Sequence, residues 1–411
     1  MGTEHGVDLG DLGVGDLHVV ALLFALQHCL SLSHILLRGN LFGDMAASVV
    51  QVLFPILPNI QRLDLSNCFA LSSIGMRRIF LSIAGWKNLS AVDFGGCDIG
   101  DIALPQLKIG LSGSCAGLRR LNLRRCRISR AGARELGDVL RSCSNLTELD
   151  LSWNPLEGAG IDSIADCLVV GLQTLNLSGP GCGHPGCVAL VRKGWNVIAG
   201  LQNLILRDAS IGDEGFGILV SGFLSHVNSL QILDVHNCGL HGESSGAVAD
   251  LLCSETTHSL ECLTLSNNYL TAEPWVQRRA LSHCGRLRYL NINGCKLSGE
   301  DVNRLLGDIP PSLRHVCISG NFSLWKGPLA ALLAEGLLEN LAARGSRLLV
   351  LECEGNDVSG DIAEKLKQHW GAAHGRGQCG ALQSAAGLIL VANEDAALHT
   401  MAACTSFCRH S

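Results

Sequence analysis

Large aliphatic residues recur along this chain in one short phrase, L-x-x-L-x-L-x-x-N/C-x-L, whose other positions are mostly polar. Twelve copies lie between Leu32 and Val358 at intervals of about 28 residues, so the chain is built from repeats. Degenerate copies begin at Leu32, Ile60, Leu89, Leu172, Leu201, Leu313 and Leu348. The clearest copies are LRRLNLRRCRI (Leu118–Ile128), LTELDLSWNPL (Leu146–Leu156), LQILDVHNCGL (Leu230–Leu240), LECLTLSNNYL (Leu260–Leu270) and LRYLNINGCKL (Leu287–Leu297).

The two halves of each repeat have different hydrophobic periods. The central L-x-L alternates with period two, which predicts a short strand with its leucines on the core side. At the ninth position, we expect Asn to bond backbone groups that would otherwise be buried unpaired, and Cys to do so more weakly. After the phrase, apolar residues such as Leu136 and Leu140 stand four apart, which predicts a helix.

A strand and a full helix within about 28 residues resemble the leucine-rich repeat family. The pattern N/C-x-L-x-x-x-G-x-x-x-L is similar to that of its ribonuclease-inhibitor-like subfamily, from Leu32 to about Trp370. The resemblance implies an α/β solenoid, or horseshoe, of about 12 repeats, with an inner parallel β-sheet and outer helices. Stacking is needed because one repeat cannot bury its own apolar face.

The repeat boundaries suggest three parts of the chain. Residues 1–31 form an N-terminal extension and cap, with an amphipathic helix from about Asp16 to Cys29. Residues 32–370 form one elongated repeat domain, in which irregular spacing predicts a longer helix through Leu329–Leu341. Residues 371–411 are rich in Gly and Ala, and we expect a poorly ordered tail, with a final strand over Leu388–Ala392 as the alternative.

Charge and apolar content point to a soluble protein of the cytoplasm. A formal net charge of -6 over 411 residues argues against a general attraction to nucleic acid or to an anionic membrane. Acidic residues precede the short apolar stretch Val19–Leu26, unlike a signal peptide, and no apolar run approaches the roughly 20 residues of a membrane span.

The chain has 19 cysteines, and their positions argue against a disulfide framework. Cysteines in repeat register are expected to be packing residues, which suits the reducing cytosol. The following stand either at the ninth position or three residues before the next phrase: Cys68, Cys97, Cys126, Cys238 and Cys295, and Cys29, Cys115, Cys143 and Cys284.

Sequence signatures of catalysis are missing from the chain. It has no phosphate-binding P-loop and no H-E-x-x-H helix, so we expect no enzyme and no cofactor. Two sets of residues could suggest a metal site, but one has too few ligands and the other matches no known spacing. They are Cys182, His184 and Cys187, and Cys379, Cys404, Cys408 and His410.

The candidate binding residues are strand side chains that are expected to face away from the core. They occupy the third, fifth, seventh and eighth positions, and the fifth forms a polar stripe that could simply keep the sheet soluble. Parallel stacking places Arg120 near Glu148 and Arg125 near Trp153, the composition of a binding hot spot. Surface ion pairs of little energetic weight are the alternative. The candidate protein-binding residues are Arg120, Arg124, Arg125, Glu148, Asp150 and Trp153, and, in a second patch, Arg207, Asp208 and His236.

These features favour a non-enzymatic scaffold or adaptor, expected to be a monomer, that docks a protein partner on the concave sheet. One alternative is a regulator similar to Ran GTPase-activating proteins, with a small GTPase as partner. That family's acidic C-terminal region is missing, because the last 41 residues hold only Glu394 and Asp395 as acids. The same repeats would also suit a ubiquitin-ligase substrate receptor or a structural component of a cilium or flagellum.

Overall fold

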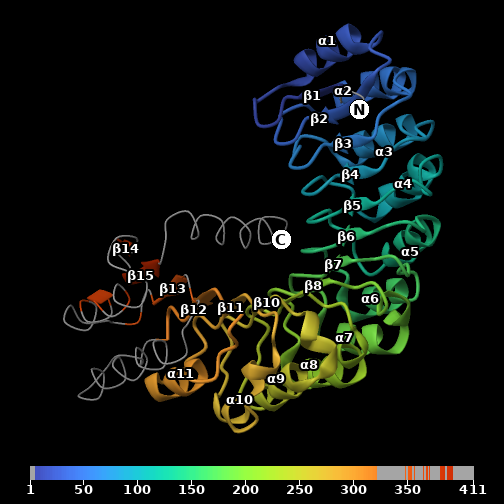
Figure 1. The fold of residues 1–411 in the computed structure, drawn as a ribbon. Helices are drawn as coiled ribbons and strands as arrows, with labels where there is room; N and C mark the ends of the chain where they lie inside the picture. The colour runs from blue at the N-terminus through green and yellow to red at the C-terminus, as the bar shows by residue number, and fades with distance from the viewer. Residues whose placement is uncertain are drawn as a thin grey trace. The chain divides into compact units, whose positions relative to one another are not determined.

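A computed structural model describes residues 5–321, 348, 350–353, 356, 364, 367, 368, 370, 380–384 and 387–391. The chain divides into two compact units, residues 1–201 and 202–411. In each unit the strands that alternate with helices form a parallel sheet whose neighbours follow chain order, and helices cover one face of it (Figure 1). The last two strands of the second unit, Gly380–Ser384 and Gly387–Val391, are antiparallel and out of chain order. Among the helices of the described chain, none has the length and apolar content that crossing a membrane requires.

The elements alternate between strand and helix through most of the chain. The first unit contains β1 (His5–Asp8), α1 (Asp16–Leu26), β2 (Leu32–Leu36), α2 (Asp44–Leu53), β3 (Arg62–Asp64), α3 (Ser73–Ser82), β4 (Ala91–Asp93), α4 (Leu104–Leu111), β5 (Arg120–Asn122), α5 (Ala133–Ser142), β6 (Glu148–Asp150), α6 (Glu157–Ala165), β7 (Thr174–Asn176) and α7 (Gly183–Lys193). The second contains β8 (Asn203–Ile205), α8 (Gly212–Gly222), β9 (Ile232–Asp234), α9 (Ser244–Cys253), β10 (Cys262–Thr264), α10 (Glu273–Gln277), β11 (Tyr289–Asn291), α11 (Gly299–Leu306), β12 (His315–Cys317), β13 (Val350–Glu352), β14 (Gly380–Ser384) and β15 (Gly387–Val391). Short 3-10 helices follow or precede several of them, at Phe54–Ile56, Asp101–Ala103, Gly194–Val197, Leu224–His226, Glu255–Ser259 and Ala280–His283.

The core lies between the strands and the helices, as the two hydrophobic periods predict. In β5, Leu121 is buried while its neighbours Arg120 and Asn122 are not. The predicted helix stripe is also confirmed, because Leu136 and Leu140 of α5 are buried. Register pairing is one to one, with Leu121 opposite Leu149 on β6, so each buried leucine continues a row along the sheet.

Buried asparagines at the ninth position join successive repeats. Oδ1 of Asn154 accepts hydrogen bonds from the backbone N–H groups of Cys126 and Ile128, at 3.0 Å each. Its Nδ2 donates to the carbonyl oxygens of Leu123, at 2.7 Å, and Leu151, at 2.9 Å. One buried side chain therefore satisfies four backbone groups in two repeats, and Asn40, Asn268 and Asn321 make corresponding bonds.

Cysteines at the same position make a smaller set of contacts. The thiol of Cys97 donates to the carbonyl oxygen of Leu65 at 3.0 Å, and the thiol of Cys126 to that of Phe94 at 3.2 Å. Each reaches back to the preceding repeat with one bond, where asparagine makes several. We expected cysteine to bond the backbone more weakly than asparagine at this position, and the smaller number of its hydrogen bonds confirms this.

Both ends of the described chain differ from the expected arrangement. A strand, β1, precedes the expected cap helix and pairs in parallel with β2. The helix α1 forms, but it is not amphipathic, because both of its sides are apolar. Val19 and Leu23 are buried, and the apolar residues Leu17 and Phe24 are exposed on its other side. The alternative strand in the tail is the one found at β15, which pairs antiparallel with β13 and β14. The expected helix over Leu329–Leu341 and the rest of the tail lie outside the described residues.

The cysteines of the described chain are free thiols. Cys143 and Cys284 are buried, as packing residues should be, but Cys29 is exposed and Cys115 is half-buried. Cys29 differs because it follows α1, the first helix of the described chain, so no preceding helix covers it. The division of the chain into residues 1–31, 32–370 and 371–411 stays a prediction.

We predict that Asn154→Ala lowers the free energy of unfolding by about 3 kcal/mol or more, because it leaves several buried backbone groups unpaired. Asn154→Cys should lower it less, since the thiol can still bond one carbonyl. Denaturant unfolding of the full chain measures both, with Cys126→Ala as the comparison that loses one weak bond. Equal losses for Asn154→Ala and Asn154→Cys would contradict the proposed role of these bonds.

Candidate functional site

The side chains that point away from the helices form a surface that we call the wall face, made of the third, fifth, seventh and eighth residues of each phrase. Short strands fix the third and fifth residues, because one-to-one register places each beside its counterpart in the next repeat. The seventh and eighth residues belong to the turn in which the strand ends. The wall face therefore presents up to four side chains per repeat in fixed positions.

Five arginines gather on β5 and beside its two ends, and we call them the arginine patch: Arg119, Arg120, Arg124, Arg125 and Arg127. Of these, Arg120, Arg124 and Arg125 occupy wall-face positions. Arg120 pairs with Glu148 on β6, with Nε and Oε1 2.9 Å apart. The guanidinium carbon of Arg125 lies 5.2 Å from the ring centroid of Trp153, in a cation–π contact. Both contacts expected from the sequence are confirmed. Binding of a partner by the patch stays a prediction.

The eighth position has an unusual backbone conformation in every repeat from β2 to β12. Its φ is positive, which L-residues with large side chains adopt at a free-energy cost of about 1 to 3 kcal/mol. Nine of these eleven residues are glycine, asparagine or aspartate, which tolerate the left-handed region. The other two are Arg125, with a φ of 51°, and Trp153, with a φ of 60°. The eleven are Gly39, Asn67, Gly96, Arg125, Trp153, Gly179, Asp208, Asn237, Asn267, Gly294 and Gly320.

Folding stability does not explain a large side chain at this position. Trp153 keeps 36% of its surface exposed, so its ring contributes less burial than a core residue would. Arg125 and Trp153 nevertheless occupy adjacent strained positions and touch each other. Arg127, Glu157, Arg279 and Lys296 also have positive φ, at other positions of the chain. At the eighth position, the strain in two neighbouring exposed residues raises the hypothesis of a functional constraint.

Fifth-position residues of the first unit form a continuous polar row, as expected. Asp64, Asp93, Asn122, Asp150 and Asn176 lie opposite one another on successive strands. The amide nitrogen Nδ2 of Asn122 donates to Asp93 at 3.0 Å, and that of Asn176 donates to Asp150 at 3.1 Å. Asp64 and Asp93 are neighbours with no asparagine between them.

Burial and charge shift the titration of this row. Burial raises the pKa of Asp93 to about 6, and the adjacent charge of Asp64 adds to the effect. Burial also raises the pKa of Asp150, although hydrogen bonds from Ser152 and the charge of Arg124 oppose it. The row thus contains buried acids that hold their protons at a higher pH than exposed carboxyl groups do.

The second predicted patch is a connected set of contacts in the other unit. Nε of Arg207 lies 2.5 Å from Oδ2 of buried Asp234, and Nδ1 of His236 lies 2.7 Å from the hydroxyl oxygen of Ser266. Asp208 accepts a hydrogen bond of 2.6 Å from Asn237. These residues lie together as predicted, but most of their polar atoms are already used within the protein.

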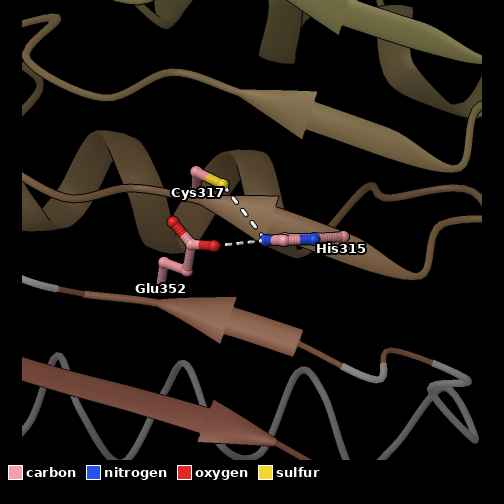
Figure 2. Close-up of side chains that lie close together, drawn as sticks. All are labelled: His315, Cys317 and Glu352. Carbon is pink, nitrogen blue, oxygen red and sulfur yellow. Dashed lines mark hydrogen bonds and ion pairs between the residues drawn. The ribbon is translucent and has the colours of Figure 1, made fainter. Parts of the chain in front are cut away.

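A third constellation on the wall face was not among the candidate sites expected from the sequence. His315, Cys317 and Glu352 bring one nitrogen, one sulfur and one oxygen to within 4.8 Å of one another (Figure 2). His315 and Cys317 are the third and fifth residues of one phrase, and Glu352 is the fifth residue of the next. The phrases that begin at Leu313 and Leu348 give this register, so a comparison of the third and fifth positions of the two phrases would have found the set.

The structure describes only one of the two sets of residues that the sequence suggested for metal binding. Cys182 is buried in the core, as expected, and Cys187 is buried with it. The set of Cys379, Cys404, Cys408 and His410 lies outside the described residues.

Comparisons with known proteins agree with the repeat structure. Leucine-rich repeat family models match residues 142–165 and 286–316. NACHT, LRR and PYD domains-containing protein 3 of Macaca mulatta is 31% identical over 247 residues, which cover 58% of this chain and 23% of that protein. Ribonuclease inhibitor of Sus scrofa is 29% identical over 274 residues, which cover 65% of this chain and 59% of the inhibitor. The chain thus spans less than two thirds of these curated relatives.

Among solved structures, the yeast complex of Rad7 and Elc1 aligns with a TM-score of 0.45 and 18% identity, over 76% of this chain and 85% of that chain. The matched family models describe repeats, and neither describes a catalytic domain.

We predict that the double substitution Arg125→Asn and Trp153→Asn leaves the free energy of unfolding within about 1 kcal/mol of its original value. Relief of the strained backbone should offset the lost cation–π contact. Denaturant unfolding measures this, and Leu151→Ala in the core is the comparison, with an expected loss of about 2 to 5 kcal/mol. A comparable loss in the double variant would make Arg125 and Trp153 structural residues.

We also predict a pH-dependent stability from Asp93. Its pKa of about 6 in the folded protein exceeds the ordinary 3.8, so the folded state holds this proton more tightly. The contribution is fully present below pH about 4 and is lost as the pH rises through about 6, by up to about 3 kcal/mol. Asp64→Asn should reduce the loss and lower the pKa of Asp93, which carboxyl-carbon NMR titration measures. Asp166→Asn, on the helix side, removes the same charge and should change neither.

Proposed function

Because the chain is a leucine-rich repeat protein with repeats of the ribonuclease-inhibitor-like type, we propose that it is a non-enzymatic scaffold that binds a protein partner on its wall face. The observation that carries the proposal is the strained pair Arg125 and Trp153. They keep large exposed side chains where the other repeats from β2 to β12 have glycine, asparagine or aspartate. Contact with a partner would explain why these two strained positions carry large side chains.

The arginine patch suggests the chemistry of that partner. Arg120 and Arg127 are largely exposed, with 61% and 76% of their side chains accessible, even though each contacts a carboxylate. Their charges are held in place by Glu148 and Asp98 but remain open to solvent. A partner surface with carboxylates around an apolar group would complement the arginines and cover Trp153.

The repeat architecture favours binding of this kind. Wall-face side chains are fixed by strand register and by the turn at the eighth position, so docking loses little conformational entropy. Two relatives, from Sus scrofa and Mus musculus, are named for the inhibition of a ribonuclease, an action on another protein. Their similarity supports a protein partner here without identifying it.

We further infer a cytoplasmic location. The cysteines of the described chain are free thiols, most of them buried, which suits a reducing compartment.

Charge reversal of the arginine patch tests the proposed function. We predict that Arg120→Glu, Arg124→Glu and Arg125→Glu together weaken partner capture at least about tenfold, because they repel the carboxylates that the patch would bind. Quantitative affinity purification from the native cell, with mass spectrometry, identifies the proteins lost. The melting temperature should change by only a few degrees, since these side chains lie outside the core.

A matched variant controls for net charge. Arg77→Glu, Arg134→Glu and Arg192→Glu reverse three arginines on α3, α5 and α7, with the same change in total charge. Capture should persist in this variant. If both triple variants kept the same partners, or if both lost them equally, the wall face would not be the docking surface.

A further inference from the structure

Three side chains with metal-binding atoms converge between β12 and β13 (Figure 2). Nε2 of His315 lies 2.7 Å from Oε1 of Glu352 and 3.2 Å from Sγ of Cys317. We propose that His315, Cys317 and Glu352 bind a divalent cation of the zinc type. The site lies in the second unit and does not depend on the arginine patch.

Burial is the first argument for a metal. The His315 side chain is only 3% exposed and that of Glu352 is 19% exposed, while Cys317 as a residue is 1% exposed. Some wall-face side chains, such as Arg120 and Arg125, are exposed to solvent, whereas here a carboxylate, an imidazole and a thiol are withdrawn from it together. Buried ionisable groups are normally paired with one another or coordinated to a metal.

The second argument is that Glu352 and Cys317 both contact the same imidazole nitrogen, Nε2 of His315. Nε2 can offer either one proton or one lone pair, so while it donates to Glu352 the thiol has to donate elsewhere, to the hydroxyl oxygen of Tyr289 at 3.5 Å. In a nucleophilic relay, the thiol and the acid would contact opposite nitrogens of the ring. Nδ1 of His315 is instead buried without a hydrogen-bond partner among the described residues. A cation shared by nitrogen, sulfur and oxygen fits this arrangement.

The donor set and the distances favour zinc. Zn²⁺ is bound by histidine nitrogen, cysteine sulfur and carboxylate oxygen, at about 2.0 to 2.3 Å. In a tetrahedron of that size the ligand atoms stand roughly 3.3 to 3.6 Å apart. The observed 2.7 and 3.2 Å would have to widen by less than about 1 Å to admit the ion. Three protein ligands leave a fourth position for water.

Tyr289 on β11 supports the ligands from the adjacent strand. Its ring packs edge-on against the imidazole of His315, with centroids 4.9 Å apart. Its hydroxyl oxygen lies 3.5 Å from Sγ of Cys317 and accepts a hydrogen bond from Asn291. If a metal binds the sulfur as a thiolate, the thiol proton leaves to solvent, and the hydroxyl can turn and donate to the thiolate. Tyr289 is therefore a positioning residue for Cys317.

Metal binding to the full-length protein tests the proposal. After treatment with a chelator, the protein should take up one equivalent of Zn²⁺ in equilibrium dialysis. Cys317→Ser and Glu352→Gln should each weaken uptake at least about a hundredfold, because a ligand is lost. With Co²⁺ as probe, the wild type should show thiolate-to-cobalt charge transfer, and Cys317→Ser should not. Tyr289→Phe should weaken binding about tenfold or more without abolishing that absorption.

A thiol outside the site provides the control. Cys262 on β10 is buried on the same wall face, two strands and thus about 10 Å from β12. Cys262→Ser should keep both the uptake and the absorption. Circular dichroism of the metal-free variants checks that each is folded. Absence of uptake by the wild type would overturn the proposal, as would equal uptake by Cys317→Ser and Cys262→Ser.

Discussion

Buried backbone groups at the turn after each strand must find hydrogen-bond partners, and this requirement holds successive repeats together. A strand of three residues cannot end within the core unless the N–H and carbonyl groups at its exit are paired. Asn154 supplies four of these partners and reaches two repeats at once. Where cysteine replaces asparagine, as at Cys126, one thiol bond and close packing take its place.

Fixed turns give the wall face its chemistry. The eighth residue projects from a left-handed turn and the fifth stands in register with its neighbours, so like positions form rows along the sheet. In the first unit these rows are charged, with arginines around Trp153 and a row of acids and amides beside them. In the second unit, charged residues such as Arg207 and Asp234 are followed by Cys262, Tyr289 and Cys317 on later strands. One scaffold thus presents two surfaces of different chemistry.

Period and position in the repeat predicted most of the fold. The strand and helix of each repeat, the buried leucines and the pairing of Arg120 with Glu148 all follow from register alone, because residues one repeat apart in a regular repeat lie side by side in the sheet.

The sequence could not reveal β1, whose few residues become a strand only by pairing with β2. The exposed apolar side of α1 was equally hidden, since Leu17 and Phe24 fit an apolar stripe as well as Val19 and Leu23 do. The candidate sites show a related limit, because His315, Cys317 and Glu352 are unremarkable one at a time and form a set only when β12 pairs with β13. Backbone strain at Arg125 and Trp153 is invisible in sequence, because only the dihedral angles distinguish a left-handed turn from an ordinary loop.

Hydroxyl-radical footprinting of two tryptophans distinguishes binding through the wall face from binding through the helices. Trp153 on the wall face and Trp195 on the helix side belong to the same unit and are 36% and 50% exposed. When the partner recovered from the native cell is bound, oxidation of Trp153 should fall severalfold while that of Trp195 stays unchanged. Protection of Trp195 with Trp153 still reactive would show that the chain binds through its helices, and the wall face would then not be the docking surface.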